Sequence, residues 1–349
     1  MIIPENLLEG KKVLLGVSGS IAVYKSLELT RLFVKAGADV KVIMTDAAKK
    51  FVTPLSFETL SRNKVLDESS ESWSDDHNHI QSGQWADLFV IAPCTANTIA
   101  KLANGIADNM LTQAALAYPD LKLIAPSANT NMLFNPITQA SLQALKSANY
   151  ELVGTQTKEL ACQTTGDGAM AEPLEIFWQA SRILLKEEFW EERSAIVSGG
   201  GTVEKIDDVR YLSNYSSGKM ASALATALFL KGADVNLIAT RRENDLPQLL
   251  QTIDVESSSE MFECLNSSIN RAKEKRLSKH PYLFMAAAVS DYVPADAQEG
   301  KLKKDMIGKT WALELEENID ILKNLDKEEI NTVAFKAEMD SETAIKNAS

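Results

Sequence analysis

Cys162 lies in the segment LACQTTGDGAMAEP, residues 160–173, where Thr and Gly surround it and no second cysteine stands nearby. A free thiol has a pKa of about 8.5, so at pH 7 it is mostly protonated and can donate a proton without special tuning. Cys94 and Cys264 are the only other cysteines, and their long spacings indicate neither a disulfide framework nor a zinc site. From this segment alone, Cys162 could serve packing, redox chemistry or proton donation.

Two histidines precede the apolar run DLFVIAP. His77 and His79 are two residues apart, so they would share a face of an extended chain and could form a metal pair. No clustered Cys or further His stands close to them, which disfavours metal binding. A single titrating imidazole at His79, acting as a base or an anion binder, fits better. The alternative is a solvated loop histidine.

The loop GVSGSI, residues 16–21, follows an apolar run and opens a helical pattern. Ser18 and Ile21 stand where the dinucleotide fingerprint requires Gly, so an NAD site is disfavoured. The loop instead offers close backbone approach and N–H groups at a helix start, which suit a single phosphate such as that of flavin mononucleotide. A plain tight turn is the alternative.

Three further loops in the same half follow apolar runs that we expect to be strands: residues 44–46, 92–98 and 125–132. Ligands of open α/β sheets bind at the edge where the strands end. The small hydroxyl and amide side chains in these loops can hydrogen-bond a planar heterocycle or a carboxylate. Ser and Asn are also common in turns, but three such loops on one edge favour a binding role.

The second half carries its own glycine loop, VSGGGT, and a helix opening SSGK at residues 216–219. It is not a P-loop, because Met220 follows Gly-Lys and Ser213 occupies the earlier Gly position. We expect MAAAVSDYVP to form a strand of small residues ending at Asp291, which would let a base or ribose approach. The lysines of KLKK, residues 301–304, offer point charges for a triphosphate, although a core strand and a solvated basic turn are the alternatives.

Strand and helix patterns alternate along the chain, which predicts an α/β fold with two doubly wound, mainly parallel sheets. The tetrapeptide GADV occurs at residues 37–40 and again at 232–235, each time between a helical pattern and a strand pattern. We therefore predict two domains, residues 1–188 and 189–349, separated near the charged segment LLKEEFWEER.

Charge and hydropathy exclude several classes of protein. The 349 residues carry 36 basic and 48 acidic side chains, a net charge of −12, which argues against the broad basic surface that nucleic acid requires. No apolar run approaches the roughly 20 residues of a membrane span, and the N-terminus lacks the features of a signal peptide. We expect a cytoplasmic protein with no nucleic acid or membrane partner.

Eight segments resemble one enzyme family of coenzyme A biosynthesis. Four resemble, in order, the flavin-dependent phosphopantothenoylcysteine decarboxylases: GVSGSIAVYK, HIQSGQWADLFVIAPCTANTIAKLANGIADNML, PSANTNM and LACQTTGDGAMAEP. Four more resemble phosphopantothenate-cysteine ligases: VRYLSNYSSGKM, AAAVSDY, KLKK and ENIDIL. Over nearly its whole length the chain thus resembles the bifunctional decarboxylase and ligase family, with a flavoprotein-type Rossmann-like domain followed by a Rossmann-like ligase domain.

For the first half, the resemblance implies FMN-dependent oxidative decarboxylation of 4'-phosphopantothenoylcysteine to 4'-phosphopantetheine. The family's catalytic histidine falls on His79, its substrate-holding asparagine on Asn129 with Met132 alongside, and its redox-active acid on Cys162. Cys162 would protonate the ene-thiolate that remains after carbon dioxide leaves. The implied FMN contacts are Gly19, Ser20, Ile21, Thr45, Thr95, Asn97 and Thr98.

For the second half, the resemblance implies that 4'-phosphopantothenate attacks CTP and that the amine of cysteine resolves the acyl-cytidylate, with Mg²⁺ bridging the phosphates. Asn214 would contact the intermediate and Lys301 would act in catalysis. The implied CTP contacts are Met285, Ala286, Ala287, Asp291, Lys301, Ile319, Asp320, Ile321, Leu322 and Phe335.

Three departures from the family pattern matter. Ala128 replaces a usual Met, which affects packing over the flavin, and Gln163 replaces a usual Gly beside Cys162, which affects the hinge of that loop. The sequence ends at SETAIKNAS, where the family would continue with triphosphate-binding lysines, so we expect a weak ligase from this chain.

The main alternative function is a flavin-binding, non-catalytic regulatory subunit, and the presence of both His79 and Cys162 disfavours it. The resemblance also implies a homo-oligomer, with trimers of the flavin domain and dimers of the ligase domain.

Overall fold

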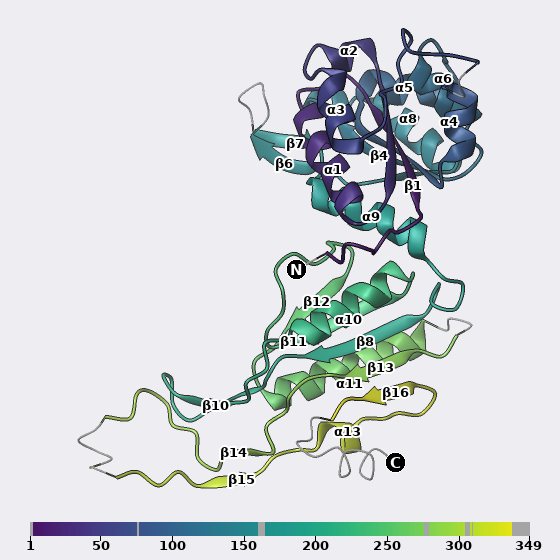
Figure 1. Ribbon diagram of the computed structural model, residues 1–349. Coiled ribbons are helices and arrows are strands. Elements are labelled where there is room, and N and C mark those ends of the chain that lie inside the picture. Colours follow the sequence, from purple (N-terminus) through teal and green to yellow (C-terminus); the bar gives the residue numbers. More distant parts are fainter. Residues whose placement is uncertain are drawn as a thin grey trace. The chain divides into compact units, whose positions relative to one another are not determined.

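The chain divides into two compact units, residues 2–185 and residues 186–349, each of which is described by itself. The computed structural model describes residues 3–74, 77–159, 165–275, 279–303, 308 and 310–336 (Figure 1). The expected domain boundary at residue 188 falls in the segment between the last helix of the first unit and the first strand of the second. Within the described ranges, no helix is both long and apolar enough to cross a bilayer.

The first unit is built on a parallel five-stranded sheet in the order β2-β1-β3-β4-β5. Its three central strands, β1, β3 and β4, are nearly continuous buried runs, as expected for a sheet that is covered on both faces. Both the sheet and its parallel direction confirm the predicted fold class. The strands are β1 (Lys12–Val17), β2 (Asp39–Met44), β3 (Leu88–Thr95), β4 (Lys122–Ser127) and β5 (Tyr150–Leu152).

Helices cover both faces of this sheet. On one face, Phe33 of α1 contacts Phe177 of α9, with the ring centroids 5.5 Å apart. On the other face, Leu14, Phe89 and Ile124 belong to a fully buried cluster with residues of α5, α6 and α8. The helices are α1 (Val23–Lys35), α2 (Asp46–Lys49), α3 (Pro54–Ser61), α4 (His79–Trp85), α5 (Ala96–Ala103), α6 (Met110–Ala117), α7 (Thr130–Leu133), α8 (Pro136–Ser147) and α9 (Pro173–Leu185).

An antiparallel hairpin, β6 (Gln156–Glu159) with β7 (Thr165–Ala169), projects from this sheet between β5 and α9 (Figure 1). The sequence predicted a Thr- and Gly-rich loop over residues 160–173, and this prediction is wrong for its middle part, which is strand β7. Gly168 has φ +130° and a Cβ there would lie 2.2 Å from the carbonyl oxygen of Ala128. The small residues therefore serve close packing of the hairpin against the loop after β4.

The second unit repeats the architecture with a parallel sheet in the order β12-β11-β8-β13-β16. Gly37 (φ +91°) and Gly232 (φ +106°) both occupy the left-handed conformation just after a helix, which explains why GADV occurs twice. The strands are β8 (Ser194–Gly199), β11 (Asp234–Ala239), β12 (Gln251–Asp254), β13 (Tyr282–Met285) and β16 (Asn331–Ala334).

Helices α10 (Lys219–Leu230) and α11 (Ser258–Glu274) cover opposite faces of the second sheet. Ile196 and Ile238 pack with α11 in one buried cluster. Gly199 faces α10, because a Cβ there would lie 2.5 Å from the Cβ of Ala221. The short helix α13 (Ile321–Asn324) precedes the edge strand β16.

Two antiparallel ribbons, which the sequence did not predict, extend from the second sheet (Figure 1). They pair β9 (Val203–Lys205) with β10 (Tyr211–Ser213), and β14 (Tyr292–Pro294) with β15 (Leu315–Glu317). The prediction of a strand of small residues from Met285 to Asp291 is wrong, since β13 ends at Met285. The N–H groups of Ala286 and Ala287 hydrogen-bond the side-chain hydroxyl of Ser198 in β8 instead of continuing the backbone pairing between the strands.

Candidate functional site

In the first unit, a buried serine joins the ends of two adjacent strands. The Ser18 hydroxyl donates to the carbonyl oxygen of Pro93 at 2.7 Å and accepts a hydrogen bond from the Thr95 N–H at 3.1 Å. Ser18 follows β1, and both partners lie in β3. The two loops are thereby fixed at the carboxyl edge of the sheet, at the point where the strand order reverses, which is where ligands of such sheets bind.

A cavity of about 600 Å³ opens beside these loops. Ser20 and Ile21 line it from the loop after β1, and Ala128 and Asn129 line it from the loop after β4. The hydroxyl oxygens of Ser20 and Ser127 are 3.0 Å apart, so these two loops are in direct contact. Of the residues predicted to contact FMN or substrate, the cavity brings together Ser20, Ile21 and Asn129.

The other predicted flavin contacts surround the same edge without lining this cavity. The Thr45 hydroxyl caps α2 by accepting the Ala48 N–H, and the Thr45 N–H donates to the carbonyl of Val17 in β1. A Cβ at Gly19 would lie 2.4 Å from the Cβ of Ala47. The turn after β1 thus packs so tightly on α2 that only glycine fits.

Helix α5 begins directly after β3, and its N-cap residue Thr95 and two residues of its first turn are the three predicted contacts at this junction. The Thr95 hydroxyl accepts the Thr98 N–H at 3.2 Å and lies 3.0 Å from the Thr98 hydroxyl. Asn97 is exposed and Thr98 is buried. The β3–α5 junction therefore presents hydroxyl and amide groups at the same edge as the loop after β1.

The loop after β4 is held by the β6–β7 hairpin. The Thr130 hydroxyl donates to the carbonyl of Asp167 at 2.7 Å, and the Ala128 N–H donates to the carbonyl of Gly168 at 3.0 Å. Asn129 caps α7 by accepting the N–H of Asn131. Met132 on α7 is 53% exposed. Cys162 and Gln163, which come between β6 and β7 in the sequence, lie outside the described residues.

Sequence reasoning missed a buried lysine in this cavity. Lys25, on α1, donates to the carbonyl of Met170 at 2.9 Å and to the carboxylate of Glu172 at 3.1 Å. Burial by itself raises the pKa of Glu172, but hydrogen bonds from Lys158 and Lys25 outweigh it and lower that pKa. The signal in the sequence was a lysine on the buried face of an amphipathic helix, shortly after the glycine loop.

His79 is the first residue of α4 and does not line the cavity. Its Nδ1 lies 2.7 Å from the Glu71 carboxylate, and its ring meets that of Trp73 edge to face at 5.7 Å. The Nε2 of His77 is buried and has no partner among the described residues. Those residues include no group of three or more His, Cys, Asp or Glu that could hold a metal ion, so they offer no support for a His77–His79 metal pair.

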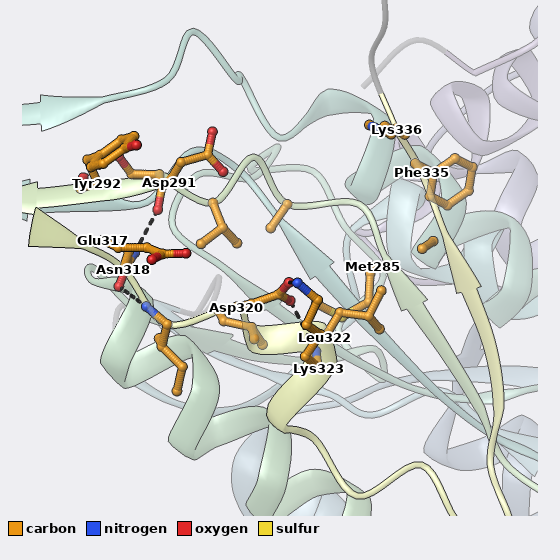
Figure 2. Close-up of a pocket in the computed structure, with 16 residues that line it drawn as sticks. Met285, Asp291, Tyr292, Glu317, Asn318, Asp320, Leu322, Lys323, Phe335 and Lys336 are labelled. Atoms are coloured by element: carbon orange, nitrogen blue, oxygen red, sulfur yellow. Dashed lines mark hydrogen bonds and ion pairs between the residues drawn. The ribbon is translucent and has the colours of Figure 1, made fainter. Parts of the chain in front are cut away.

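The second unit contains a larger cavity, of about 1090 Å³, at the corresponding edge of its sheet. Side chains from residues 285–292, 317–323 and 334–336 surround it (Figure 2). Most of the predicted CTP contacts line it: Met285, Ala287, Asp291, Ile319, Asp320, Ile321, Leu322 and Phe335. Ala286 and Lys301 do not.

Asn214 directly follows the β9–β10 ribbon, and its side chain contacts the segment after β13 that lines this cavity. Its amide nitrogen donates to the carbonyls of Ala288 at 3.3 Å and Val289 at 3.2 Å. Gly201 lies against it, since a Cβ there would be 2.6 Å from the Asn214 carbonyl oxygen. The glycine loop after β8 therefore lets Asn214 approach the irregular segment that follows β13.

Asn318 is a further site residue that sequence reasoning missed. Its amide nitrogen donates to the carbonyl of Ser290 at 2.7 Å, and its N–H donates to the carbonyl of Asp291 at 2.9 Å (Figure 2). Asp320 caps α13 by accepting the Lys323 N–H at 3.0 Å. Hydrogen bonds from Lys323 lower the pKa of Asp320, so the cavity presents a carboxylate at neutral pH.

Two family models match this chain. The Flavoprotein model matches residues 1–181, and the model described as "DNA/pantothenate metabolism flavoprotein C-terminal domain" matches residues 190–349. The chain is 38% identical to the coenzyme A biosynthesis bifunctional protein CoaBC of Vibrio cholerae over 95% of its length and 82% of the relative. It is 40% identical to the CoaBC protein of Bacillus subtilis, over 95% and 81% of the two lengths.

Solved structures also match about half of this chain. A PPC decarboxylase mutant complexed with pantothenoylaminoethenethiol is 34% identical, covering 49% of this chain and 96% of its own, with a TM-score of 0.45. The FMN binding protein AtHal3 is 35% identical, covering 49% of this chain and 94% of its own, with a TM-score of 0.43.

Proposed function

The chain belongs to the family of coenzyme A biosynthesis bifunctional proteins CoaBC, and from that premise we propose which residues carry its two reactions. Residues 1–188 are proposed to decarboxylate 4'-phosphopantothenoylcysteine with FMN. Residues 189–349 are proposed to ligate cysteine to 4'-phosphopantothenate with CTP. The observation that carries the proposal is the meeting of Ser20, Ile21 and Asn129 at one cavity.

The loops of the first unit fit a flavin mononucleotide. The Gly19 turn would bring backbone N–H groups to the phosphate at the start of α1, since no Cβ intervenes. Hydroxyl and amide groups of Thr45, Thr95 and Asn97 would hydrogen-bond the remainder of the cofactor. Bound FMN would supply two-electron oxidation of the cysteinyl thiol end and the later return of those electrons.

Three residues are proposed to act on the substrate. Asn129, at the cavity, would hold the substrate carboxylate. At His79, Nδ1 is engaged by Glu71, so Nε2 is the nitrogen that would exchange a proton with substrate. Cys162 would donate the proton that completes the product, a role that rests on the family motif because Cys162 lies outside the described residues.

The second cavity is proposed to bind CTP. Small and apolar side chains of Met285 and Ala287 would allow close approach of the base and ribose, with Phe335 on another wall. The carboxylate of 4'-phosphopantothenate would attack the α-phosphate and release pyrophosphate. Asn214 would hydrogen-bond the acyl-cytidylate, and Lys301 would stabilise charge on the phosphates.

Mg²⁺ is proposed to accompany CTP. The carboxylates of Asp291, Glu317 and Asp320 line the cavity, and Mg²⁺ is commonly bound by one or two carboxylates together with substrate phosphates. Among the described residues, these carboxylates form no group of three that could hold an ion by themselves, so the triphosphate would supply most of the ligands. Asp291 is the proposed protein ligand because it adjoins the small-residue segment.

We further propose that first units assemble as trimers and second units as dimers. Ile21 and Tyr24 are 58% and 61% exposed beside the first cavity. Met132 and Phe134, on and after α7, are also more than half exposed. Covering these side chains in an assembly would remove apolar surface from water.

The purified chain should be yellow and release FMN on heating, identified by its mass. With 4'-phosphopantothenoylcysteine it should release carbon dioxide, and with CTP, cysteine and 4'-phosphopantothenate it should release pyrophosphate. A colourless protein that takes up no added FMN would contradict the decarboxylase proposal. Absence of CTP-dependent pyrophosphate would contradict the ligase proposal alone.

A further inference from the structure

Asp207 lies in the turn between β9 and β10, and its side chain is fully buried. One carboxylate oxygen accepts the N–H groups of Val209 at 2.9 Å and Arg210 at 2.7 Å. The other oxygen accepts the Arg210 Nε–H at 3.0 Å and the Leu302 N–H at 3.1 Å. Four donors thus converge on one carboxylate, and one of them comes from a segment 95 residues away.

The distant segment is the one that carries Lys301. The Arg210 guanidinium donates to the Leu302 carbonyl at 2.6 Å, so Leu302 is held at both its N–H and its carbonyl. On the other side of Lys301, Gly300 and Asp208 exchange two hydrogen bonds, of 2.9 and 3.3 Å. The backbone is therefore fixed on both sides of Lys301 while the lysine side chain is exposed.

These contacts decide where Lys301 lies, because the chain around it has little structure of its own. Residues 295–303 and the described residues between Gly308 and Glu314 form no helix or strand. The β14–β15 ribbon pairs their two ends, at Pro294 and Leu315. Residues 207–210 provide almost all of the described hydrogen bonds between residues 298–303 and parts of the unit that are distant in sequence. Apart from these, the described residues show only one such bond, from the Gln298 N–H to the Ile206 carbonyl.

We propose that Asp207 is a positioning residue for Lys301 in the CTP-dependent reaction. It would act through Leu302 and Arg210 and touch neither substrate nor nucleotide. The inference rests on the proposed ligase activity and adds to it the group that places the lysine. A small displacement of a catalytic group lowers a rate by about 10²-fold, which is the scale of effect expected from loss of the tether.

Asp207→Asn tests this with little change of volume. The amide NH₂ would face the Leu302 N–H and the Arg210 Nε–H, so donor would oppose donor and the tether would open. We expect kcat/KM for CTP-dependent pyrophosphate release to fall by about 10²-fold. Decarboxylation serves as the internal control, because it belongs to the other unit.

A double-mutant cycle separates positioning from general stability. If Asp207 acts through Lys301, Asp207→Asn should cost less than about threefold in a Lys301→Met background, since the lysine it places is already gone. A merely structural carboxylate would lower activity equally in both backgrounds, and that result would overturn the proposal. Asp326→Asn is the matched control, because Asp326 is exposed and pairs with Lys273 at 2.8 Å; ligation by it should be unchanged.

Hydrogen exchange tests the tether without any turnover. Peptides covering residues 298–303 should exchange at least about tenfold faster in Asp207→Asn than in the unsubstituted chain. Unchanged exchange there would overturn the inference even if ligation falls, because the loss would then not come from release of this segment. A chain with no CTP-dependent pyrophosphate release before any substitution would instead remove the proposed ligase function, and the role of Asp207 in it.

Discussion

Each unit places a buried serine hydroxyl where its strand order reverses, between β1 and β3 in the first and between β8 and β13 in the second. Ser18 donates to one backbone carbonyl of β3 and accepts one backbone N–H. Ser198 accepts two backbone N–H groups, those of Ala286 and Ala287. The same device thus fixes the loop at the ligand edge in both units.

The path of the chain beyond the serine contact differs between the units. In the first, β3 runs directly into α5, so the site residues on that loop are consecutive in sequence. In the second, the chain leaves the sheet after Met285, extends into the β14–β15 ribbon and returns to the cavity at Glu317. A site made of local turns and a site made of distant segments can therefore stand on the same sheet topology.

Substituting one glycine in each unit gives the largest expected effect and tests whether the two sites are independent. In Gly19→Ala, the new Cβ would lie 2.4 Å from Ala47, so we expect loss of bound FMN and of decarboxylation, with ligation retained. In Gly201→Ala, the new Cβ would lie 2.6 Å from the Asn214 carbonyl, so we expect the reverse pattern. Flavin absorbance and pyrophosphate release report the two outcomes.

Gly154→Ala is the control for both variants, because nothing lies within 4 Å of a Cβ at that position. It should retain flavin and both activities. Loss of both activities in Gly19→Ala, or in Gly201→Ala, would show that the two units depend on each other.

His79→Asn should keep flavin and lower kcat for decarboxylation by about 10² to 10⁴, the usual contribution of a general acid or base. Glu71→Gln should give a smaller loss, because an amide oxygen can still accept from Nδ1 at the 2.7 Å contact. Carbon dioxide release by stopped assay, with flavin content measured on the same samples, checks both variants. Full turnover by His79→Asn would remove His79 from the mechanism.

The contrast between the two sites explains what the sequence could predict. Four strands of the first unit, β1 to β4, are apolar runs that each end in a polar loop, so the parallel sheet and the loops at its edge were predictable. The roles of Ser20 and Asn129 within those loops came from the family resemblance. Lys25 was not predictable, because a lysine in an amphipathic helix is usually solvated. In the second unit, the ribbons and Asn318 depend on contacts between distant segments, such as Asp207 with Leu302, and local patterns carry no information on these.

Substituting Ser18 and Ser198 with alanine should show that the two serine contacts differ in how much they contribute to the free energy of unfolding. Ser198→Ala leaves two part-buried N–H groups without their acceptor and should lower the free energy of unfolding by about 3 kcal/mol. Ser18→Ala leaves one such N–H and should cost about half as much. Urea unfolding followed by pulsed hydrogen exchange reports each unit separately. Ser147→Ala, on the exposed face of α8, is the control and should change the unfolding free energy of neither unit. Equal losses in Ser18→Ala and Ser198→Ala would contradict the expectation that the loss scales with the number of N–H groups left without an acceptor.

Acid should reveal a difference that depends on pH, at Asp67 of the first unit. Burial by itself raises the pKa of Asp67, but hydrogen bonds from Lys49, Ser69 and Ser70 outweigh it and lower that pKa from 3.8 to about 2. Because the pKa is lower in the folded state, the stabilisation is complete above pH 4 and is lost as the pH falls toward 2. The shift corresponds to about 2 kcal/mol of unfolding free energy.

Asp67→Asn should therefore unfold at a lower urea concentration than the unsubstituted chain at pH 7, and the difference should shrink between pH 4 and pH 2. Asp46→Asn is the matched control, because Asp46 pairs with the same Lys49 but has a 74% exposed side chain, and an exposed ion pair contributes little. A loss that is equal in the two variants and independent of pH would mean that Asp67 acts by packing alone. Helix α2 carries Lys49, the partner of Asp67, and is capped by Thr45, a proposed flavin contact. A pH-dependent loss of stability should therefore be accompanied by weaker flavin binding below pH 4. Ligation by the second unit should be unaffected by Asp67→Asn.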